Sequence, residues 1–105
     1  MPQRNKTHFS HPGAILKREF LDEIGLRPGT LARLIGVDRS RVKAIIEGKR
    51  DITADTALRL GKFLGTTPDF WMNLQSHYNL AVAAGGAKRD ISQIHPWRDD
   101  ARVVA

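Results

Sequence analysis

The chain contains no cysteine among its 105 residues, so disulfide bridges and thiolate metal sites are excluded. A lack of cysteine also fits a protein of the reducing cytoplasm. No apolar run approaches the roughly 18 residues that a membrane-spanning helix needs. The polar start MPQRNKTHFSHPG does not resemble a signal peptide. We therefore expect a cytoplasmic protein that does not associate with membranes.

Residue combinations that carry catalysis are also missing. The four histidines are scattered, with no two at the spacing of metal ligands. The sequence has neither a Ser–His–Asp signature nor a phosphate-binding loop. We therefore expect no enzymatic activity, no metal ion and no cofactor.

Acidic residues are scarce relative to basic ones. The chain has 11 Asp and Glu residues against 17 Lys and Arg residues, which gives a formal net charge of +6. Such an excess on a small domain attracts polyanions, most commonly the phosphate backbone of a nucleic acid. The alternative is a merely soluble basic protein. The length and the 41% content of hydrophobic residues predict one folded domain with a modest core.

Apolar residues recur at helical spacing in five segments, and no stretch alternates clearly enough to predict a strand. The sequence therefore predicts an all-α fold. Capping residues, first-turn prolines and terminal glycines set the limits of the segments. The predicted helices cover residues 11–23, 28–35, 38–47, 53–64 and 67–84.

Each predicted helix has one apolar face. We expect Ser10 to cap the first helix, and the segment GGAKRD to break the last one. Residues 1–7 and 85–105 are expected to be flanking tails of a domain that covers residues 8–84. The expected buried positions are Leu16, Phe20, Leu21 and Ile24; Leu31, Ala32 and Ile35; Val42, Ile45 and Ile46; Ala57, Leu58, Gly61 and Leu64; and Phe70 and Trp71.

The second and third predicted helices are joined only by the tripeptide GVD, residues 36–38. Two short helices with so tight a glycine-containing connection are typical of the helix-turn-helix motif. In that motif the second helix enters the major groove of DNA. A helical wheel places Val42, Ile45 and Ile46 on a face that can dock this helix against the domain. The opposite face is free to meet the bases.

Basic and small polar residues surround that free face. Arginine can bind guanine in a bidentate manner, serine can contact a base or a phosphate, and alanine can meet a thymine methyl group. Lysine and arginine after the helix end can contact the phosphate backbone. Each of these residues taken singly could equally be an ordinary solvated surface residue. The predicted DNA-binding residues are Arg39, Ser40, Arg41, Lys43 and Ala44 on the helix, Lys49 and Arg50 after it, and Arg27 at the start of the preceding helix.

The segment LARLIGVDRSRVKAIIEGKRDITADTALRLGKFLGTTPDFWMNLQSHYNL, together with HPGAILKREFL before it, resembles the HigA-type antitoxins of the Xre (lambda-repressor-like) helix-turn-helix family. The resemblance covers about residues 11–80. It implies a five-helix domain, a homodimer and binding to a palindromic operator in the protein's own promoter. It also implies a partner, a HigB-type toxin that is a small RelE-like ribonuclease. Ala44 departs from the longer polar residue that relatives often carry there, so base reading is expected to rest on the first turn.

Two other functions remain open from the sequence. The chain could be a stand-alone Xre-family transcriptional regulator without a toxin, or a protein-interaction module that does not bind DNA. Trp97 lies in the polar context HPWRDD, where an exposed tryptophan often marks a contact. We expect it at a dimer or toxin interface.

Overall fold

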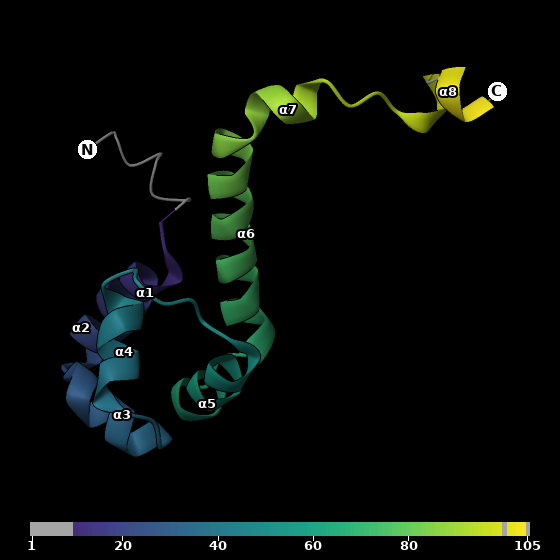
Figure 1. Cartoon of the computed structure of the whole chain (residues 1–105). Coiled ribbons are helices and arrows are strands. Elements are labelled where there is room, and N and C mark those ends of the chain that lie inside the picture. Colours follow the sequence, from purple (N-terminus) through teal and green to yellow (C-terminus); the bar gives the residue numbers. More distant parts are fainter. Residues whose placement is uncertain (1–9, 100, 105) are drawn as a thin grey trace.

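The computed structural model describes residues 10–99 and 101–104, and these residues form helices without any strand (Figure 1). The predicted all-α fold is confirmed within this part of the chain, whereas the expected tail at residues 1–7 lies outside it. The elements are α1 (Pro12–Ile15), η2 (Leu16–Leu21), α2 (Asp22–Ile24), α3 (Pro28–Ile35), α4 (Arg39–Ile46), α5 (Ala54–Leu64), α6 (Pro68–Gly86), α7 (Lys88–Ser92), η3 (Trp97–Asp99) and α8 (Ala101–Val104).

The first predicted helix is a continuous helix, but its middle, η2, is π-helical. The Asp22 N–H donates to the Lys17 carbonyl five residues back, so residues five apart share a face. Leu16 and Leu21 are accordingly both buried, whereas Ile24 is 57% exposed. The prediction that Ile24 belongs to the buried face was wrong because it assumed α-helical spacing throughout.

The cap of this helix also differs from the prediction. His11, not Ser10, occupies the N-cap position, and its Nδ1 accepts a hydrogen bond of 2.9 Å from the Gly13 N–H. Pro12 is the first helical residue, and the cap is by definition the residue just before it. An imidazole nitrogen thus takes the place of the usual serine oxygen.

Helix α3 has the predicted limits, and its predicted inner face of Leu31, Ala32 and Ile35 is buried. In α5 the prediction is wrong for one residue: Leu58 is 60% exposed, and Leu60 is buried instead. Leu60 lies with Ala57, Gly61 and Leu64 on one α-helical face, to which Leu58 does not belong.

Gly61 is needed where α5 meets the start of α6. A Cβ at this position would lie 2.9 Å from the Thr66 carbonyl oxygen and 3.2 Å from the Pro68 nitrogen. The close neighbour is therefore the connection that follows α5.

The core lies between the first five helices of the chain. Trp71 of α6 is completely buried at its centre, as predicted, and its Nε1 donates to the Thr66 hydroxyl at 2.8 Å. Phe20 and Phe70 pack around its ring, with centroids at 5.1 and 4.9 Å. The buried Gln75 accepts a hydrogen bond of 2.7 Å from the Ile52 N–H. This bond ties α6 to the segment that follows α4.

Helix α6 extends well beyond this core (Figure 1). It continues through Gly85 and Gly86, so the predicted break comes later, at Ala87, after which α7 begins. We call residues 10–78 the body and the described residues from 79 onward the arm. The arm has no buried residue in its described part, and it exposes Leu80, Val82, Ile91, Ile94, Trp97 and Val103. Within the described residues, no helix is both long and apolar enough to cross a bilayer.

Candidate nucleic-acid interface

Helices α3 and α4 form the helix-turn-helix unit that the sequence predicts. Gly36 ends α3 with a left-handed φ of 75°, and the Val37 N–H donates to the Ala32 carbonyl at 3.0 Å. Asp38 occupies the N-cap of α4, although its side chain makes no capping hydrogen bond. The predicted docking face of α4 is confirmed, because Val42 and Ile45 are buried and Ile46 packs against the core.

Gly13 sets the position of α4 from below. A Cβ at Gly13 would lie 1.7 Å from the Ile45 carbonyl oxygen, so only glycine allows α1 to approach the end of α4 this closely. The contact is between backbones, and a side-chain rotation cannot relieve it. The recognition helix is thus held both by its apolar face and by the start of α1.

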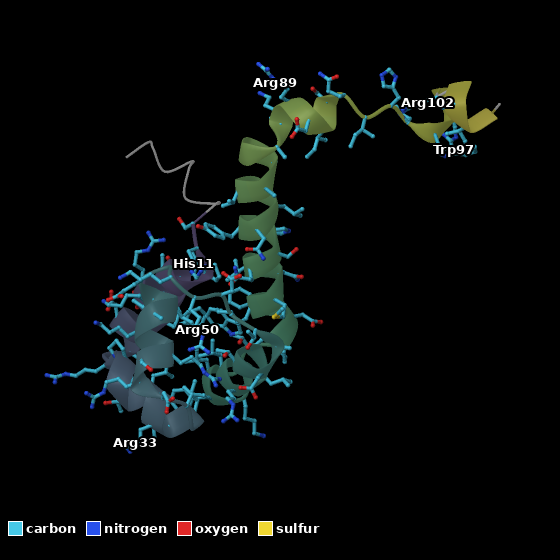
Figure 2. The ribbon with its side chains drawn as sticks, viewed as in Figure 1. His11, Arg33, Arg50, Arg89, Trp97 and Arg102 are labelled. Carbon is cyan, nitrogen blue, oxygen red and sulfur yellow. The ribbon has the colours of Figure 1, made fainter. Side chains whose placement is uncertain are left out.

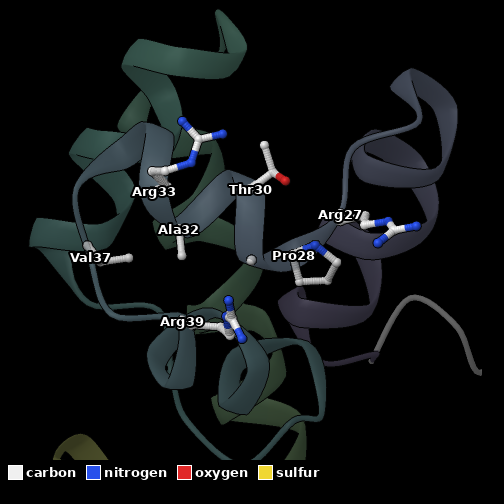
Figure 3. A pocket seen from close by; sticks show the side chains of 8 residues that line it. Arg27, Pro28, Thr30, Ala32, Arg33, Val37 and Arg39 are labelled. Carbon is white, nitrogen blue, oxygen red and sulfur yellow. The ribbon is translucent and has the colours of Figure 1, made fainter.

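Arg39 lies on the α3 side of the recognition helix. Its guanidinium runs close to Gly29, where a Cβ would lie 3.1 Å from Nε. An open groove of about 640 Å³ lies here, with Thr30 and three arginines in its lining (Figure 3). The arginines are Arg27, Arg33 and Arg39, and all three are exposed and without an ion pair to any described residue. The groove therefore concentrates positive charge.

Sequence reasoning missed Arg33. It identified Arg27 and Arg39 from their places at helix starts, but Arg33 lies inside α3. Only its position on the α3 face opposite Leu31 and Ile35 could have indicated that it points outward.

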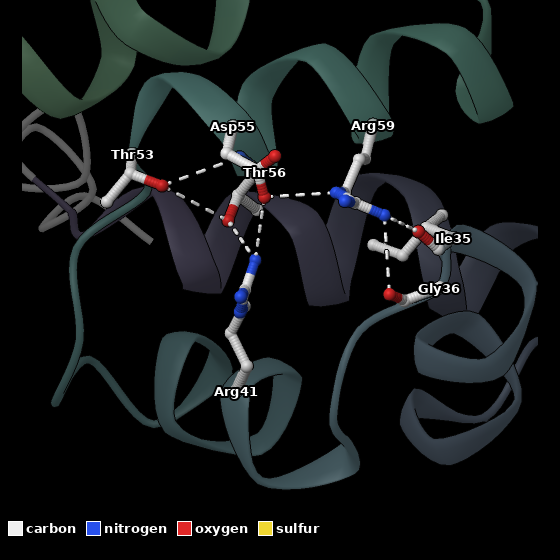
Figure 4. A network of polar contacts seen from close by, with 7 residues as sticks. All are labelled: Ile35, Gly36, Arg41, Thr53, Asp55, Thr56 and Arg59. Carbon is white, nitrogen blue, oxygen red and sulfur yellow. Dashed lines mark hydrogen bonds and ion pairs between the residues drawn. The ribbon is translucent and has the colours of Figure 1, made fainter.

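Arg41 lies on the other side of the recognition helix, against α5 (Figure 4). Its Nη1 donates to Asp55 Oδ2 at 2.9 Å and to the Thr56 hydroxyl at 3.4 Å. The same Oδ2 accepts a bond of 3.0 Å from Arg59 Nε. These hydrogen bonds from Arg41 and Arg59 lower the pKa of the Asp55 carboxyl. Arg39 and Arg41 are therefore directed to opposite flanks of one helix.

The middle of the exposed edge carries Ser40, Lys43 and Ala44. Ser40 and Lys43 are exposed and Ala44 is half-buried. Glu47, one turn after Lys43, lies 3.7 Å from the Lys43 ammonium and 3.5 Å from that of Lys49. Its carboxylate thus faces its positive neighbours.

The end of the unit is marked by Lys49 and Arg50. Both are exposed after Gly48, which has a φ of 75° (Figure 2). Trp97 lies far from this surface on η3, 65% exposed, with Arg98 Cζ 5.6 Å from its ring centroid. Of the predicted site residues, the fold gathers all except Trp97 on the α3–α4 unit.

Comparison with known proteins identifies the family. A sequence model of the helix-turn-helix family matches residues 17–71, which span α3, α4 and α5. Virulence-associated protein I of Dichelobacter nodosus is 41% identical over 101 residues, which cover 96% of this chain and 93% of that protein. Antitoxin HigA-1 of Vibrio cholerae is 41% identical over 68 residues, covering 65% of this chain and 64% of the antitoxin.

A solved structure agrees with these sequence relatives. The structure of the Pseudomonas aeruginosa antitoxin HigA with the higBA promoter superposes with a TM-score of 0.79 at 45% identity. The match covers 82% of this chain and 95% of that antitoxin. The resemblance to HigA-type antitoxins seen in the sequence is thereby confirmed.

Proposed function

Since this chain belongs to the helix-turn-helix family and is similar to its HigA antitoxins, we propose that it binds operator DNA as a dimer and represses its own operon as an antitoxin. The observation that carries this proposal is the α3–α4 unit. Its second helix is rigidly docked through Val42 and Ile45 and presents a basic, exposed edge. A HigA antitoxin of the same fold has been crystallised with its promoter.

Base reading is assigned to the first turns of α4. Arg39, Ser40 and Lys43 are exposed there and have donors that reach base edges, and Ala44 can meet a thymine methyl group. Arg41 also lies on this helix, but it is engaged by Asp55 and reaches the duplex only by leaving that carboxylate.

Phosphate contacts are assigned to the residues around the reading edge. Lys49 and Arg50 follow the helix, and Arg27 lies at the start of α3, where free backbone N–H groups also attract an anion. Arg33 joins Arg27 in the same groove. Contacts of this kind fix the protein on the duplex without reading its sequence.

Substitution of one reader and one phosphate contact tests these assignments. Arg39→Ala is expected to relax the preference at one base position, losing about 1–3 kcal/mol of discrimination. Lys49→Ala is expected to weaken all sequences equally and to reduce the salt dependence. Lys62→Ala, on the exposed side of α5, is the matched control. Mobility shifts with operator and scrambled duplexes at several salt concentrations measure all three. Unchanged discrimination by Arg39→Ala would reject the assignment of the recognition helix.

We infer further that the antitoxin neutralises a HigB-type ribonuclease by direct contact and that the arm takes part in protein contacts. The support is the row of apolar side chains on the arm, including Leu80, Ile91, Ile94 and Trp97, which are exposed in a single chain. Apolar surface of this kind is favourable to bury against another protein. Trp97 is assigned to the dimer or toxin interface.

Co-purification with the product of the neighbouring reading frame tests the toxin contact. A Trp97→Ala chain is expected to lose dimerisation or toxin binding while its operator-binding unit stays folded. If Trp97→Ala dimerises and binds the toxin as the parent does, the assignment of Trp97 fails. Operator binding without any toxin partner would instead identify a stand-alone regulator. Toxin binding without any specific duplex binding would identify an interaction module.

A further inference from the structure

We propose that Asp55 is a specificity-determining residue, which competes with DNA for Arg41 and so keeps this arginine from adding sequence-independent affinity. The inference rests on the operator binding proposed above. Asp55 lies on α5, outside the helix-turn-helix unit, and no feature of the motif itself would single it out.

The contacts of Arg41 show how its charge is engaged. Its side chain is 28% exposed, whereas that of Lys43, two residues further on, is 70% exposed. One nitrogen, Nη1, makes both of its hydrogen bonds, to Asp55 and Thr56. Nε and Nη2 are left without a hydrogen bond to any residue that the structure describes. Arg41 is thus held through one corner of its guanidinium and retains donors for a second acceptor.

Asp55 is itself fixed relative to the recognition helix. Arg59, one turn later on α5, donates from Nε to Asp55 and from Nη1 to the Ile35 carbonyl at 2.8 Å and the Gly36 carbonyl at 3.3 Å (Figure 4). These carbonyls belong to the end of α3 and the turn. Arg59 therefore connects α5 to the helix-turn-helix unit and directs Asp55 toward α4.

A carboxylate and a phosphate compete for the same guanidinium. Both are anionic oxygen acceptors that arginine binds with similar geometry. Because the pair is partly exposed, it is weak enough for a nearby phosphate to displace it. A phosphate gained in this way would come from any sequence, since backbone contacts carry no base information. Asp55 thus suppresses nonspecific binding more than operator binding.

The test compares the parent with Asp55→Asn, which keeps the size of the side chain and removes its charge. Fluorescence anisotropy with an operator duplex and a scrambled duplex of equal length gives both affinities over a range of salt. We expect the affinity for the scrambled duplex to rise several-fold and that for the operator to rise less. The salt slope for the scrambled duplex should steepen by about 0.9, the equivalent of one added phosphate contact.

Two further variants separate release of Arg41 from a general change of charge. Asp69→Asn removes an exposed carboxylate from the first turn of α6 and is expected to change neither ratio nor slope. In an Arg41→Ala background, Asp55→Asn is expected to have no effect, because there is no arginine to release. If it raises the affinity equally in that background, simple repulsion is the cause and the proposal is overturned.

The remaining outcomes also decide the proposal. Weaker operator binding with unchanged scrambled binding would mean that Asp55 orients Arg41 as a base reader, which overturns it. Failure of the parent chain to discriminate the two duplexes would reject the proposed operator binding instead. Circular dichroism checks the fold of each variant. If Asp55→Asn does not fold, Asp55→Ser keeps a polar residue in the first turn of α5 and is expected to give the same changes.

Discussion

The body and the arm are both helical, yet they are held in different ways. In the body, residues as far apart as Leu16 and Trp71 are buried against one another. The arm has no buried residue in its described part and consists of helices that contact little beyond their own turns. Short helices gain most of their stability from tertiary packing. The comparison teaches that the body can fold by itself, whereas the arm needs a partner to bury its apolar side chains.

The two tryptophans offer the sharpest contrast, because each region contains one. Trp71→Ala removes a completely buried side chain and its bond to Thr66, and it should lower the free energy of unfolding by about 3–5 kcal/mol. Trp97→Ala should change it by no more than about 0.5 kcal/mol, as at most surface positions. Urea unfolding followed by circular dichroism measures both. Similar losses for the two variants would break the distinction between body and arm.

The glycines supply a second pair. Gly13→Ala should destabilise the body by about 1–3 kcal/mol, because the new Cβ meets the Ile45 carbonyl and forces α1 away from α4. Gly85→Ala, within α6, meets no atom within 4 Å and should stabilise its helix by up to about 1 kcal/mol. The two substitutions are chemically identical and opposite in expected sign. Thermal unfolding of both proteins is the measurement, and a stabilised Gly13→Ala chain would contradict the close contact.

The body should also lose stability in mild acid through His11. Burial lowers the pKa of His11, although Asp51, 3.8 Å away, acts in the opposite direction. The unfolded chain therefore binds the proton more readily, and stability should fall as the pH drops below about 6.5, the ordinary value for histidine. A protonated His11 also cannot accept the Gly13 hydrogen bond that caps α1.

Denaturation midpoints at pH 7.5 and pH 5.5 would measure this loss. His11→Asn keeps a capping acceptor and removes the titration, so its midpoint should depend less on pH. His77→Asn, at an exposed position of α6, is the control and should behave as the parent does. An equal pH dependence in all three proteins would show that His11 is not responsible.

Removal of the arm should have the smallest effect on the body. A chain that ends at Gly86 loses no buried residue, so its unfolding midpoint should shift by only a few degrees at most. Differential scanning calorimetry measures the shift. A large loss of stability would show that the arm packs on the body, contrary to the comparison.

The sequence predicted best where local signals mark an element at both ends. Pro28 begins α3 and Gly36 ends it, and the predicted limits agree with the structure. Thr53 and Thr67 cap the next two helices as expected for residues with side-chain acceptors. Apolar periodicity then identified the docking face of α4 correctly.

The errors have physical causes that periodicity does not contain. A π-helical turn changed the phase of the first helix and turned Ile24 outward. The pair Gly85–Gly86 did not stop α6, because glycine only weakens a helix. The engagement of Arg41 by Asp55 joins residues 14 positions apart, through a contact that exists only after α5 packs on the motif. The sequence therefore indicated which residues are basic and exposed, but not which are already paired.

Helix α6 is an unbroken rod of 19 residues, which at 1.5 Å per residue is about 28 Å long. Its first turns are packed in the body, and its last turns carry the arm away from it (Figure 1). A protein held on the arm therefore stands clear of the α3–α4 unit. One molecule has room for two simultaneous occupants, one at each end of the rod, and the stoichiometry of such an assembly is set by geometry instead of by competition for a shared surface.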